Sequence, residues 1–309
     1  MYIVRNRKFF FILTGVLLAG AIGAIAFFGL PLSIDFTGGS LVEVSYTNPR
    51  PSIDALNADV KQLALGEGTV LPSGTNGALL RTRTLTPEEH NAVLAALSEN
   101  GKAPLTELRF NSIGPSLGAE LGLKSLYALL AVIAAIMLYI AWAFRRVSRP
   151  VSSWVYGGIV VVILVHDVII PTGFYAILCH FTGAQVDSLF VVALLAILGY
   201  SVNDTIVIFD RVREHLHRNI EHNVKEPFEL TVGKSVTETL GRSINTSLTV
   251  VLALLALAFI GSSATVNFAW VLLVGVIAGT YSSILLAAPL LIPLANTFAK
   301  DGSSKPKKR

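Results

Sequence analysis

Residues 199–209 read Gly-Tyr-Ser-Val-Asn-Asp-Thr-Ile-Val-Ile-Phe and place a carboxylate, Asp204, inside an apolar run that covers 187–209. An aspartate at the centre of a membrane helix costs about 2.5–3.5 kcal/mol on insertion scales. An acid in this setting predicts a functional site with a charged partner. The candidate partner is Arg242, at the start of the next apolar stretch.

The composition indicates a membrane protein. The 309 residues are 53% hydrophobic and only 14% charged, whereas an average soluble domain is about 25% charged. Apolar runs that approach or exceed the ~20 residues needed to cross a bilayer cover 9–29, 125–144, 153–178, 187–209, 244–261 and 268–298. The sequence therefore predicts six transmembrane helices.

Basic residues predict the orientation. Lys and Arg occur before the first span, after the second, between the fourth and fifth, and at the end of the chain: Arg5, Arg7, Lys8; Arg145, Arg146, Arg149; Arg211, Arg213, Arg218, Lys225, Lys234, Arg242; Lys300, Lys305, Lys307, Lys308, Arg309. The segments 179–186 and 262–267 contain neither residue. The positive-inside rule then places both termini in the cytoplasm. This asymmetry accounts for the pI of ≈ 9.2, so we expect no nucleic-acid partner.

Between the first two spans lies a water-soluble segment. Strand alternation in 40–46, helical spacing from Ile53, short strands near 69–72 and 78–84, a capping box at Thr86 and a last strand over 105–110 give the order β-α-β-β-α-β. That order is typical of a ferredoxin-like α+β module. Its role is open: it either stabilises a complex or holds an extended polypeptide by edge-strand pairing.

The predicted organisation follows from these patterns. Residues 1–29 form the cytoplasmic N-terminus and first span, and 30–123 the external module. Residues 124–298 form a five-helix membrane region with a cytoplasmic loop at 210–243, and 299–309 a basic cytoplasmic tail.

Polar residues in two spans cluster by helical period. Tyr200, Ser201 and Asp204 share one helix face. A narrow polar stripe in the next span has the spacing i, i+3, i+4, i+7 and should face the bundle interior: Arg242, Asn245, Thr246 and Thr249. The hydrogen bonds that a buried ion pair needs would come from Tyr200, Ser201, Asn203, Asn245, Thr246 and Thr249.

Two readings of the Asp204–Arg242 pair remain open. In the first, Asp204 is ionised beside Arg242 and takes up a proton when the two separate in a dry bundle, so that protonation selects between helix arrangements. In the second, the pair is a static salt bridge that fixes helix register.

A second polar dyad, His166-Asp167, lies in the third span. Adjacent residues on a helix point about 100° apart, so we expect them not to form one site. Each is either a proton relay residue or a packing residue. The sequence shows no metal motif and no nucleophile motif such as Gly-x-Ser-x-Gly, so we expect no enzyme and no cofactor. The coupling ion that we expect is the proton.

Three blocks resemble the SecF family, the smaller subunits of the SecD–SecF accessory complex of bacterial protein export, within the resistance-nodulation-division (RND) superfamily. They are LSIDFTGG at 32–39, with Asp35, Gly38 and Gly39; GYSVNDTIVIFDRVR at 199–213; and SVTETLGRSINTS at 235–247. Glu238 replaces the Gln usual in the last block and is an alternative partner for Arg242.

The resemblance implies an RND-like bundle in the bacterial cytoplasmic membrane and a proton pathway through Asp204 and Arg242. It implies that the chain acts with SecD, uses the proton motive force and promotes preprotein export through the SecYEG channel. YajC and YidC are further candidate partners. The alternatives are half of an RND-type small-molecule or lipid transporter, or a passive assembly subunit. The pairs Gly275-x-x-x-Gly279 and Gly118-x-x-x-Gly122 permit close helix approach, either at a SecD interface or within this chain.

Overall fold

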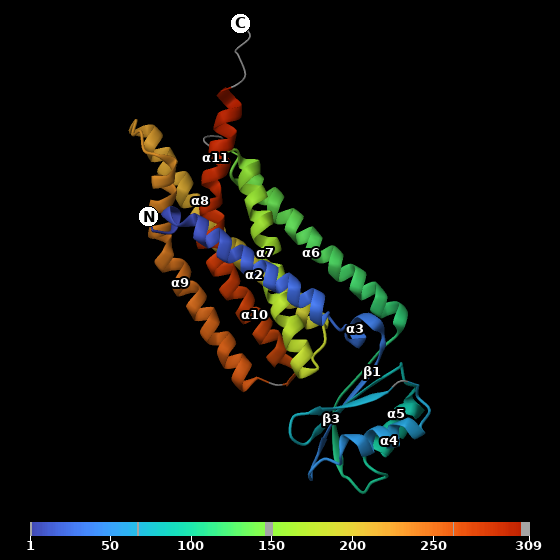
Figure 1. Ribbon diagram of the computed structural model, residues 1–309. Helices are drawn as coiled ribbons and strands as arrows, with labels where there is room; N and C mark the ends of the chain where they lie inside the picture. The colour runs from blue at the N-terminus through green and yellow to red at the C-terminus, as the bar shows by residue number, and fades with distance from the viewer. Residues whose placement is uncertain (1, 67, 146–150, 262, 304–309) are drawn as a thin grey trace. The chain divides into compact units, whose positions relative to one another are not determined.

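The computed structural model describes residues 2–66, 68–145, 151–261 and 263–303 (Figure 1). The chain divides into two compact units. One comprises 1–31, 127–184 and 189–309; the other comprises 32–126 together with the short segment 185–188. Several basic residues used to predict orientation lie outside the described residues: Arg146, Arg149, Lys305, Lys307, Lys308 and Arg309.

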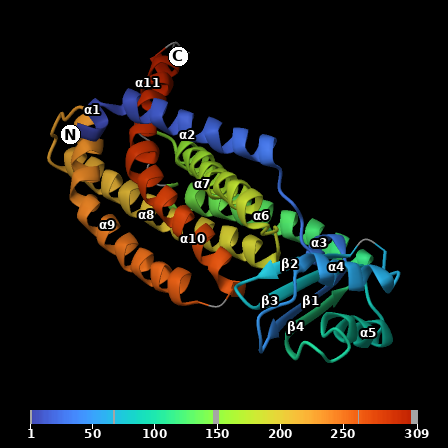
Figure 2. The same ribbon diagram turned by 60° about the horizontal axis from the view of Figure 1, so that its bottom comes forward.

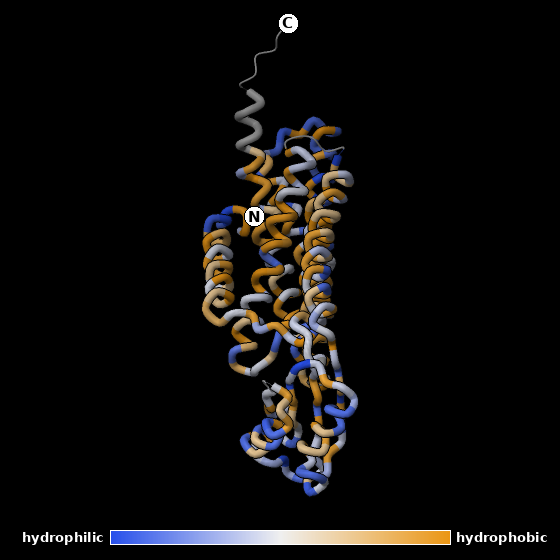
Figure 3. The backbone as a smooth tube through the Cα atoms, turned by 90° about the vertical axis from the view of Figure 1, so that its right-hand side faces the viewer, coloured by the Kyte–Doolittle hydropathy of each residue, from blue (hydrophilic) through white to orange (hydrophobic). Residues whose placement is uncertain are grey.

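The first unit is a helical bundle, and the prediction of six spans is confirmed. The candidate spans are Arg7–Phe28, Pro115–Ala143, Ser153–Thr182, Ser188–Glu221, Phe228–Ile260 and Thr265–Ala295. The helices that contain them are α2 (Arg7–Phe28), α6 (Pro115–Ala143), α7 (Ser153–Thr182), α8 (Ser188–Glu221), α9 (Phe228–Ile260) and α10 (Ser263–Ser282) continued by η1 (Ser283–Ala287) and α11 (Ala288–Ser303); a short helix α1 (Tyr2–Arg5) precedes them. Figure 3 shows that hydrophobic residues dominate these helices.

Helix α10 is central to the bundle. It packs against α7 and α9, and its glycines bring it close to α8. A Cβ atom at Gly275 would lie 2.1 Å from Ile197 Cδ1, and one at Gly279 would lie 2.9 Å from Ser201 Cβ. The Gly275–Gly279 pair therefore packs within this chain.

The last span is interrupted by η1, a five-residue π-helical segment over Ser283–Ala287. π-Bulges inside α-helices are rare and often occur at functional sites. Ser282 and Ser283 are both fully buried at this point, so the irregular backbone places two hydroxyl groups in the bundle interior.

The second unit is an α+β module with the predicted element order. Its elements are α3 (Ile34–Thr37), β1 (Gly39–Tyr46), α4 (Ile53–Gln62), β2 (Thr69–Ser73), β3 (Gly77–Thr82), α5 (Pro87–Leu97) and β4 (Leu105–Ile113). The strands form one antiparallel sheet in the order β2-β3-β1-β4 (Figure 2), with a register irregularity between Glu43 and Val44.

The core of this module lies between the sheet and the two helices α4 and α5. Strand residues Val42 and Leu80 pack in one cluster with helix residues Leu56, Val93 and Leu97. Thr86 and Glu89 form the predicted capping box at the start of α5. The alternation of β1 and the 3.6-residue period of α4 thus point their apolar faces at each other.

Candidate functional site

Asp204 lies on the buried face of α8. It is 5% exposed, and Ser201, Thr205 and Ile208 on the same face are also buried. Among the described residues, its Oδ2 atom has no hydrogen-bond partner of ordinary geometry. Three side chains of α9 face this carboxyl group: Ser243 and Ser247 through their hydroxyl groups, and Arg242 through its charge. A buried carboxyl oxygen without a partner is costly and marks this position as the candidate site.

The face of α9 that turns inward is a row of hydroxyl residues. Ser235, Thr239, Ser243 and Ser247 repeat every four residues, and all are buried. Ser235 and Thr239 donate to carbonyl groups of their own helix, four residues earlier, at 2.8 and 2.9 Å. Within the described part of the chain, Ser243 Oγ, like Asp204 Oδ2, has no partner. Two unsatisfied polar atoms therefore lie on neighbouring helices.

The prediction that the Arg242 stripe faces the bundle interior is wrong for this chain by itself. Arg242, Asn245, Thr246 and Thr249 are all exposed. Their i, i+3, i+4, i+7 positions form the face beside the hydroxyl row. Small hydroxyl residues satisfied by their own helix can be buried at low cost, whereas an arginine cannot.

Asp204 and Arg242 are consequently not in contact. No ion pair joins them among the described residues, and Arg242 acts on Asp204 only through its longer-range charge. Glu238, the alternative partner, is engaged elsewhere: it pairs with Arg211 and, at 3.1 Å, with His215, both on α8. The static salt bridge between Asp204 and Arg242 is therefore absent from this conformation.

The supporting residues divide into two groups. Tyr200 donates to Ser247 Oγ at 3.2 Å, and Ser247 in turn lies 2.6 Å from Thr280 Oγ1 on α10. Ser201 is buried and bonded to Asp167. Asn203, in contrast, is exposed. Ser243, Ser247 and Thr280 were not predicted from the sequence, because single hydroxyl residues in a membrane helix give no hydropathy signal.

His166 and Asp167 form one site, and the expectation that they do not is wrong. His166 Nδ1 lies 2.8 Å from Asp167 Oδ1, and the two side chains are 3% and 0% exposed. His166 Nε2 also contacts the Tyr281 hydroxyl, and Ser201 donates to Asp167 Oδ2. The 100° separation sets where the Cβ atoms start. From there the His166 ring and the Asp167 carboxyl group turn toward each other along the helix surface.

These contacts define the buried polar cluster, the set Tyr281, His166, Asp167 and Ser201, contributed by α10, α7 and α8. Next to it, Thr205 Oγ1 lies 2.8 Å from Ser283 Oγ in η1. Each buried hydroxyl and carboxyl group in the cluster has a partner, as buried polar groups require. Tyr281 and Ser283 were not predicted, because only the fold brings them to α7 and α8.

The residues after the first span form a junction within the second unit. Asp35 Oδ2 accepts hydrogen bonds from the Ser188 backbone N–H at 2.8 Å and from its hydroxyl at 2.6 Å. Gly38, at φ +76°, meets Pro115, since a Cβ there would lie 2.6 Å from Pro115 Cα. Gly39 has φ +130°, and its added Cβ would lie 2.7 Å from the Thr82 carbonyl oxygen. Both glycines are thus required by backbone conformation and by close packing.

The Gly118–Gly122 pair belongs to the same junction. A Cβ at Gly118 would lie 2.7 Å from Gly38 N, and Gly122 faces the Phe36 side chain at 3.7 Å. This pair also packs within the chain. It allows the start of α6 to pack closely against the turn after the first span.

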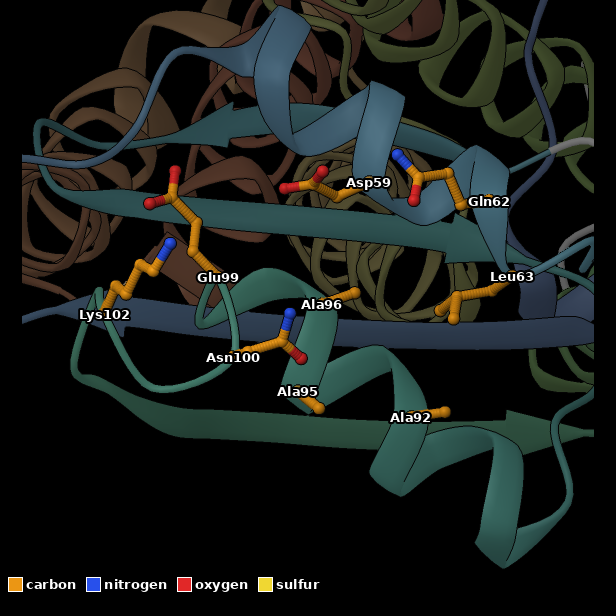
Figure 4. Close-up of a pocket in the computed structure, with 9 residues that line it drawn as sticks. All are labelled: Asp59, Gln62, Leu63, Ala92, Ala95, Ala96, Glu99, Asn100 and Lys102. Carbon is orange, nitrogen blue, oxygen red and sulfur yellow. The ribbon is translucent and has the colours of Figure 1, made fainter.

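The surface of the module carries a pocket between α4 and α5. Figure 4 shows its lining, which includes Asp59, Glu99 and Lys102 at its polar rim and alanines from α5. The cavity measures about 480 Å³ and is open to solvent. Within the described ranges, no group of three His, Cys, Asp or Glu residues is arranged to hold a metal ion.

Known protein families match both the helical bundle and the junction after the first span. The family model of the SecD/SecF protein export membrane protein, C-terminal region, matches residues 93–297, and the SecD/SecF GG motif matches 23–49. Protein translocase subunit SecF of Anaerolinea thermophila is 37% identical over 94% of this chain and 92% of its own length. The chain belongs to the SecF family.

Other members agree. SecF of Thermobaculum terrenum is 36% identical over 95% of this chain and 94% of its own length. The crystal structure of SecDF, a translocon-associated membrane protein from Thermus thermophilus, aligns with a TM-score of 0.80 at 30% identity. It covers 96% of this chain, which spans 39% of the longer SecDF chain. As a SecF family member with six apolar helices, this chain is a multi-pass membrane protein with an RND-like fold.

Proposed function

We propose that this SecF family member works with SecD to use the proton motive force for preprotein export through the SecYEG channel. The observation that carries the proposal is Asp204, an acid inside a membrane span with one buried carboxyl oxygen that has no hydrogen-bond partner among the described residues. An ionised carboxylate would be costly there, so uptake of a proton changes the energy of this packing directly.

The cycle uses two arrangements of α8 and α9. In the one described, Asp204 is buried and Arg242 does not contact it, so an ionised carboxylate would have no counter-charge beside it. A rotation of α9 that brings Arg242 inward would favour the ionised form. A charge that crosses the full membrane potential carries about 2.3 kcal/mol per 100 mV, which suffices to bias packing states a few kcal/mol apart.

The outward polar stripe of α9 supports SecD as the partner. Arg242 and Asn245 would be unfavourable against lipid, so a protein surface should cover them. In this proposal SecD covers the polar stripe of α9. A membrane carboxylate from SecD would then be a second partner for Arg242. YajC and YidC would bind the same assembly elsewhere.

The proposed topology is that of the bacterial cytoplasmic membrane with both termini inside. Arg211, Arg213 and Arg218 lie near the end of α8, and Lys234 lies near the start of α9. By the positive-inside rule this end faces the cytoplasm. The α+β module follows the last residue of α2 and precedes the first residue of α6. In this topology it lies on the outer side of the membrane.

The module would hold the emerging preprotein. Strands β2 and β4 are the sheet edges. The β2 edge is five residues long and contains Pro72, which cannot donate to a new strand. The β4 edge is nine residues long and exposes Leu108. Strand addition to β4 is the recognition mode that this edge allows.

The test is reconstitution with SecD, SecYEG and the motor ATPase into vesicles, with gradient-dependent preprotein release measured. Asp204→Asn should abolish the response to the gradient, and Arg242→Lys should impair it because Lys keeps the charge but loses the planar fork. The control is Asp210→Asn on the same helix, where the exposed acid pairs with Arg213 at 3.6 Å. If Asp204→Asn assembles and responds like the wild type, the chain is a passive assembly subunit.

A further inference from the structure

We infer that His166 and Asp167 form a second proton-binding site and exchange their proton with Asp204 through Ser201. This inference rests on the proposed proton-driven function and names further residues for it. The evidence is the continuous line of contacts from the Tyr281 hydroxyl to His166, from His166 to Asp167, and from Asp167 to Ser201. The line crosses three separate spans.

The pair is enclosed within the bundle. His166 is 2% and Asp167 0% exposed, and His166 is the ion-pairing partner that the described structure gives Asp167. With neutral imidazole and ionised carboxylate the pair would carry an unbalanced negative charge in the bundle core. One added proton, on either His166 or Asp167, makes it neutral overall.

The groups around the pair do not supply that balance. Tyr281 on α10 contributes a hydroxyl group, as does Ser201 on α8, and Asp204 on α8 is a further acid. Arg242 on α9 is exposed and interacts with Asp204 only at longer range. Among the described residues, Asp167 and Asp204 are therefore two buried acids without a cation in contact, and a proton bound to one can neutralise only that one.

Ser201 is the connection between the two acids. It lies three residues before Asp204 on the same buried face of α8, which puts the two side chains about 5–6 Å apart at their Cβ atoms. Its hydroxyl donates to Asp167 Oδ2. When Asp167 is protonated, the bond reverses, and the Ser201 hydroxyl proton becomes free to turn toward Asp204.

The transfer balances as a simple exchange. Protonated Asp167 gives its proton to Ser201 Oγ, while Ser201 gives its own hydroxyl proton to ionised Asp204. Asp204 becomes neutral and Asp167 becomes ionised beside His166. One negative charge thus moves from α8 to α7. Tyr281 Oη, which contacts His166 Nε2, is the place where a new proton enters.

A groove beside α9 and α10 lies next to the Tyr281 end of this line of contacts. Its cavity measures about 380 Å³, and Ser247, Thr280 and Tyr281 are its polar lining residues. Tyr281 therefore contacts both this groove and His166. The rest of the lining is apolar, including Ile277 and Ile284.

The packing around Ser201 indicates a built site. A Cβ at Gly279 would lie 3.0 Å from Ser201 Oγ, so only glycine leaves Ser201 its present position. The π-helical η1 adds Ser283, which lies 3.4 Å from the Ser201 carbonyl oxygen. A glycine of α10 and the π-helical segment that follows thus both pack against Ser201.

The experiment has a spectroscopic and a functional arm, both on the full chain reconstituted with SecD. In the first, ¹⁵N NMR of labelled histidine follows His166 across pH in wild type, Asp204→Asn, Ser201→Ala and Asp204→Asn/Ser201→Ala. We expect Asp204→Asn to change the pH dependence of the His166 signal and Ser201→Ala to remove that change. Exposed His217, which pairs with Glu221, should not respond.

In the second arm, gradient-driven preprotein release is measured for Tyr281→Phe, Asp167→Asn and Ser201→Ala. Each should lower the rate about 10²-fold or more, as expected for loss of a positioned proton-transfer group. The matched control is Thr172→Val on the helix that carries His166, which removes a hydroxyl that donates to the Val168 carbonyl group and not to His166 or Asp167. Its rate should stay near wild type.

The outcomes separate the two proposals. Suppose that Asp204→Asn stops gradient-driven release, that Tyr281→Phe, Asp167→Asn and Ser201→Ala do not, and that the His166 signal is unchanged in Asp204→Asn. The relay is then refuted, and the proposed function stands. If the wild type shows no gradient response, the proposed function fails. The histidine spectra still decide whether the two acids are coupled.

Discussion

The carboxylate of Asp35 holds Ser188 by two hydrogen bonds, to the backbone N–H at 2.8 Å and to the hydroxyl at 2.6 Å. Ser188 is the first residue of α8, the helix that carries Asp204. The segment after the first span thus caps the start of this helix from a distant part of the chain. Anions are favoured at such an end because the first N–H groups of a helix lack partners.

Removing this cap should loosen the start of α8. Asp35→Ala is expected to cost about 1 kcal/mol of local stability, the usual value for a lost N-terminal cap. The measurement is amide hydrogen exchange of the residues that follow Ser188, which should become faster. Asp54→Ala, in the first turn of α4, is the control, and equal exchange in both variants would contradict a capping role.

Packing of α8 on α10 should depend on Gly279. Gly279→Ala places a Cβ 2.9 Å from Ser201 Cβ, and overpacking of this kind typically costs about 1–3 kcal/mol. Thermal unfolding in detergent should show a lower midpoint. Gly199→Ala on α8 is the matched control, since its added Cβ has no heavy atom within 4 Å. A midpoint lowered equally by both changes would exclude the close contact as the cause.

Acid should weaken the α5 end of the module through Glu89. The hydrogen bond from Arg83, followed by that from the Thr86 backbone, lowers the pKa of Glu89 to about 2. The ionised form is therefore favoured by folding. Its contribution is present above the ordinary value of 4.5 and is lost as pH falls through 4.5 toward 2.

The variant Glu89→Gln tests this dependence. Its unfolding midpoint should lie below that of the wild type at neutral pH, and the difference should disappear as the pH approaches 2. Neighbouring Glu88→Gln, at an exposed position outside the capping box, should leave the midpoint at neutral pH near that of the wild type. A constant gap between wild type and Glu89→Gln at all pH values would show that the carboxylate charge is irrelevant.

Alkaline pH should act on the module through Tyr46. Its hydroxyl donates to the Leu97 carbonyl at 2.9 Å, and burial, followed by the charge of Glu99, raises its pKa to about 12. Folding favours the neutral phenol, so this stabilisation is complete below about pH 10, the ordinary value, and is lost as pH rises through about 12. The difference between the ultraviolet titrations of wild type and Tyr46→Phe should show one late phenolate. Its appearance near pH 10 would contradict the burial.

The six spans and the module could be predicted because their signals are local. Apolar runs of bilayer length and the strand and helix periods of 40–110 need no knowledge of distant residues. The seating of Val186 and Ser188 against the segment that begins at Leu32 could not be predicted, because it joins residues far apart in the chain.

The site was predicted only in part for the same reason. Asp204 is conspicuous as a charge among apolar residues. The hydroxyl row of α9, represented by Ser243 and Ser247, is not, because serine in a membrane helix changes the hydropathy little. The Arg242 stripe has a clear period, but a period identifies a face without saying what that face contacts. The meeting of His166 with Tyr281 depends on how α7 and α10 pack.

The central claim is that Asp204 gains and loses a proton as the membrane is energised. The most direct measurement is infrared difference spectroscopy of the chain reconstituted with SecD, recorded before and after a proton gradient is imposed. We predict a carboxylic-acid C=O band that changes with the gradient, shifts in D₂O and is absent from Asp204→Asn. A spectrum in which Asp204 stays ionised with and without the gradient would contradict the account.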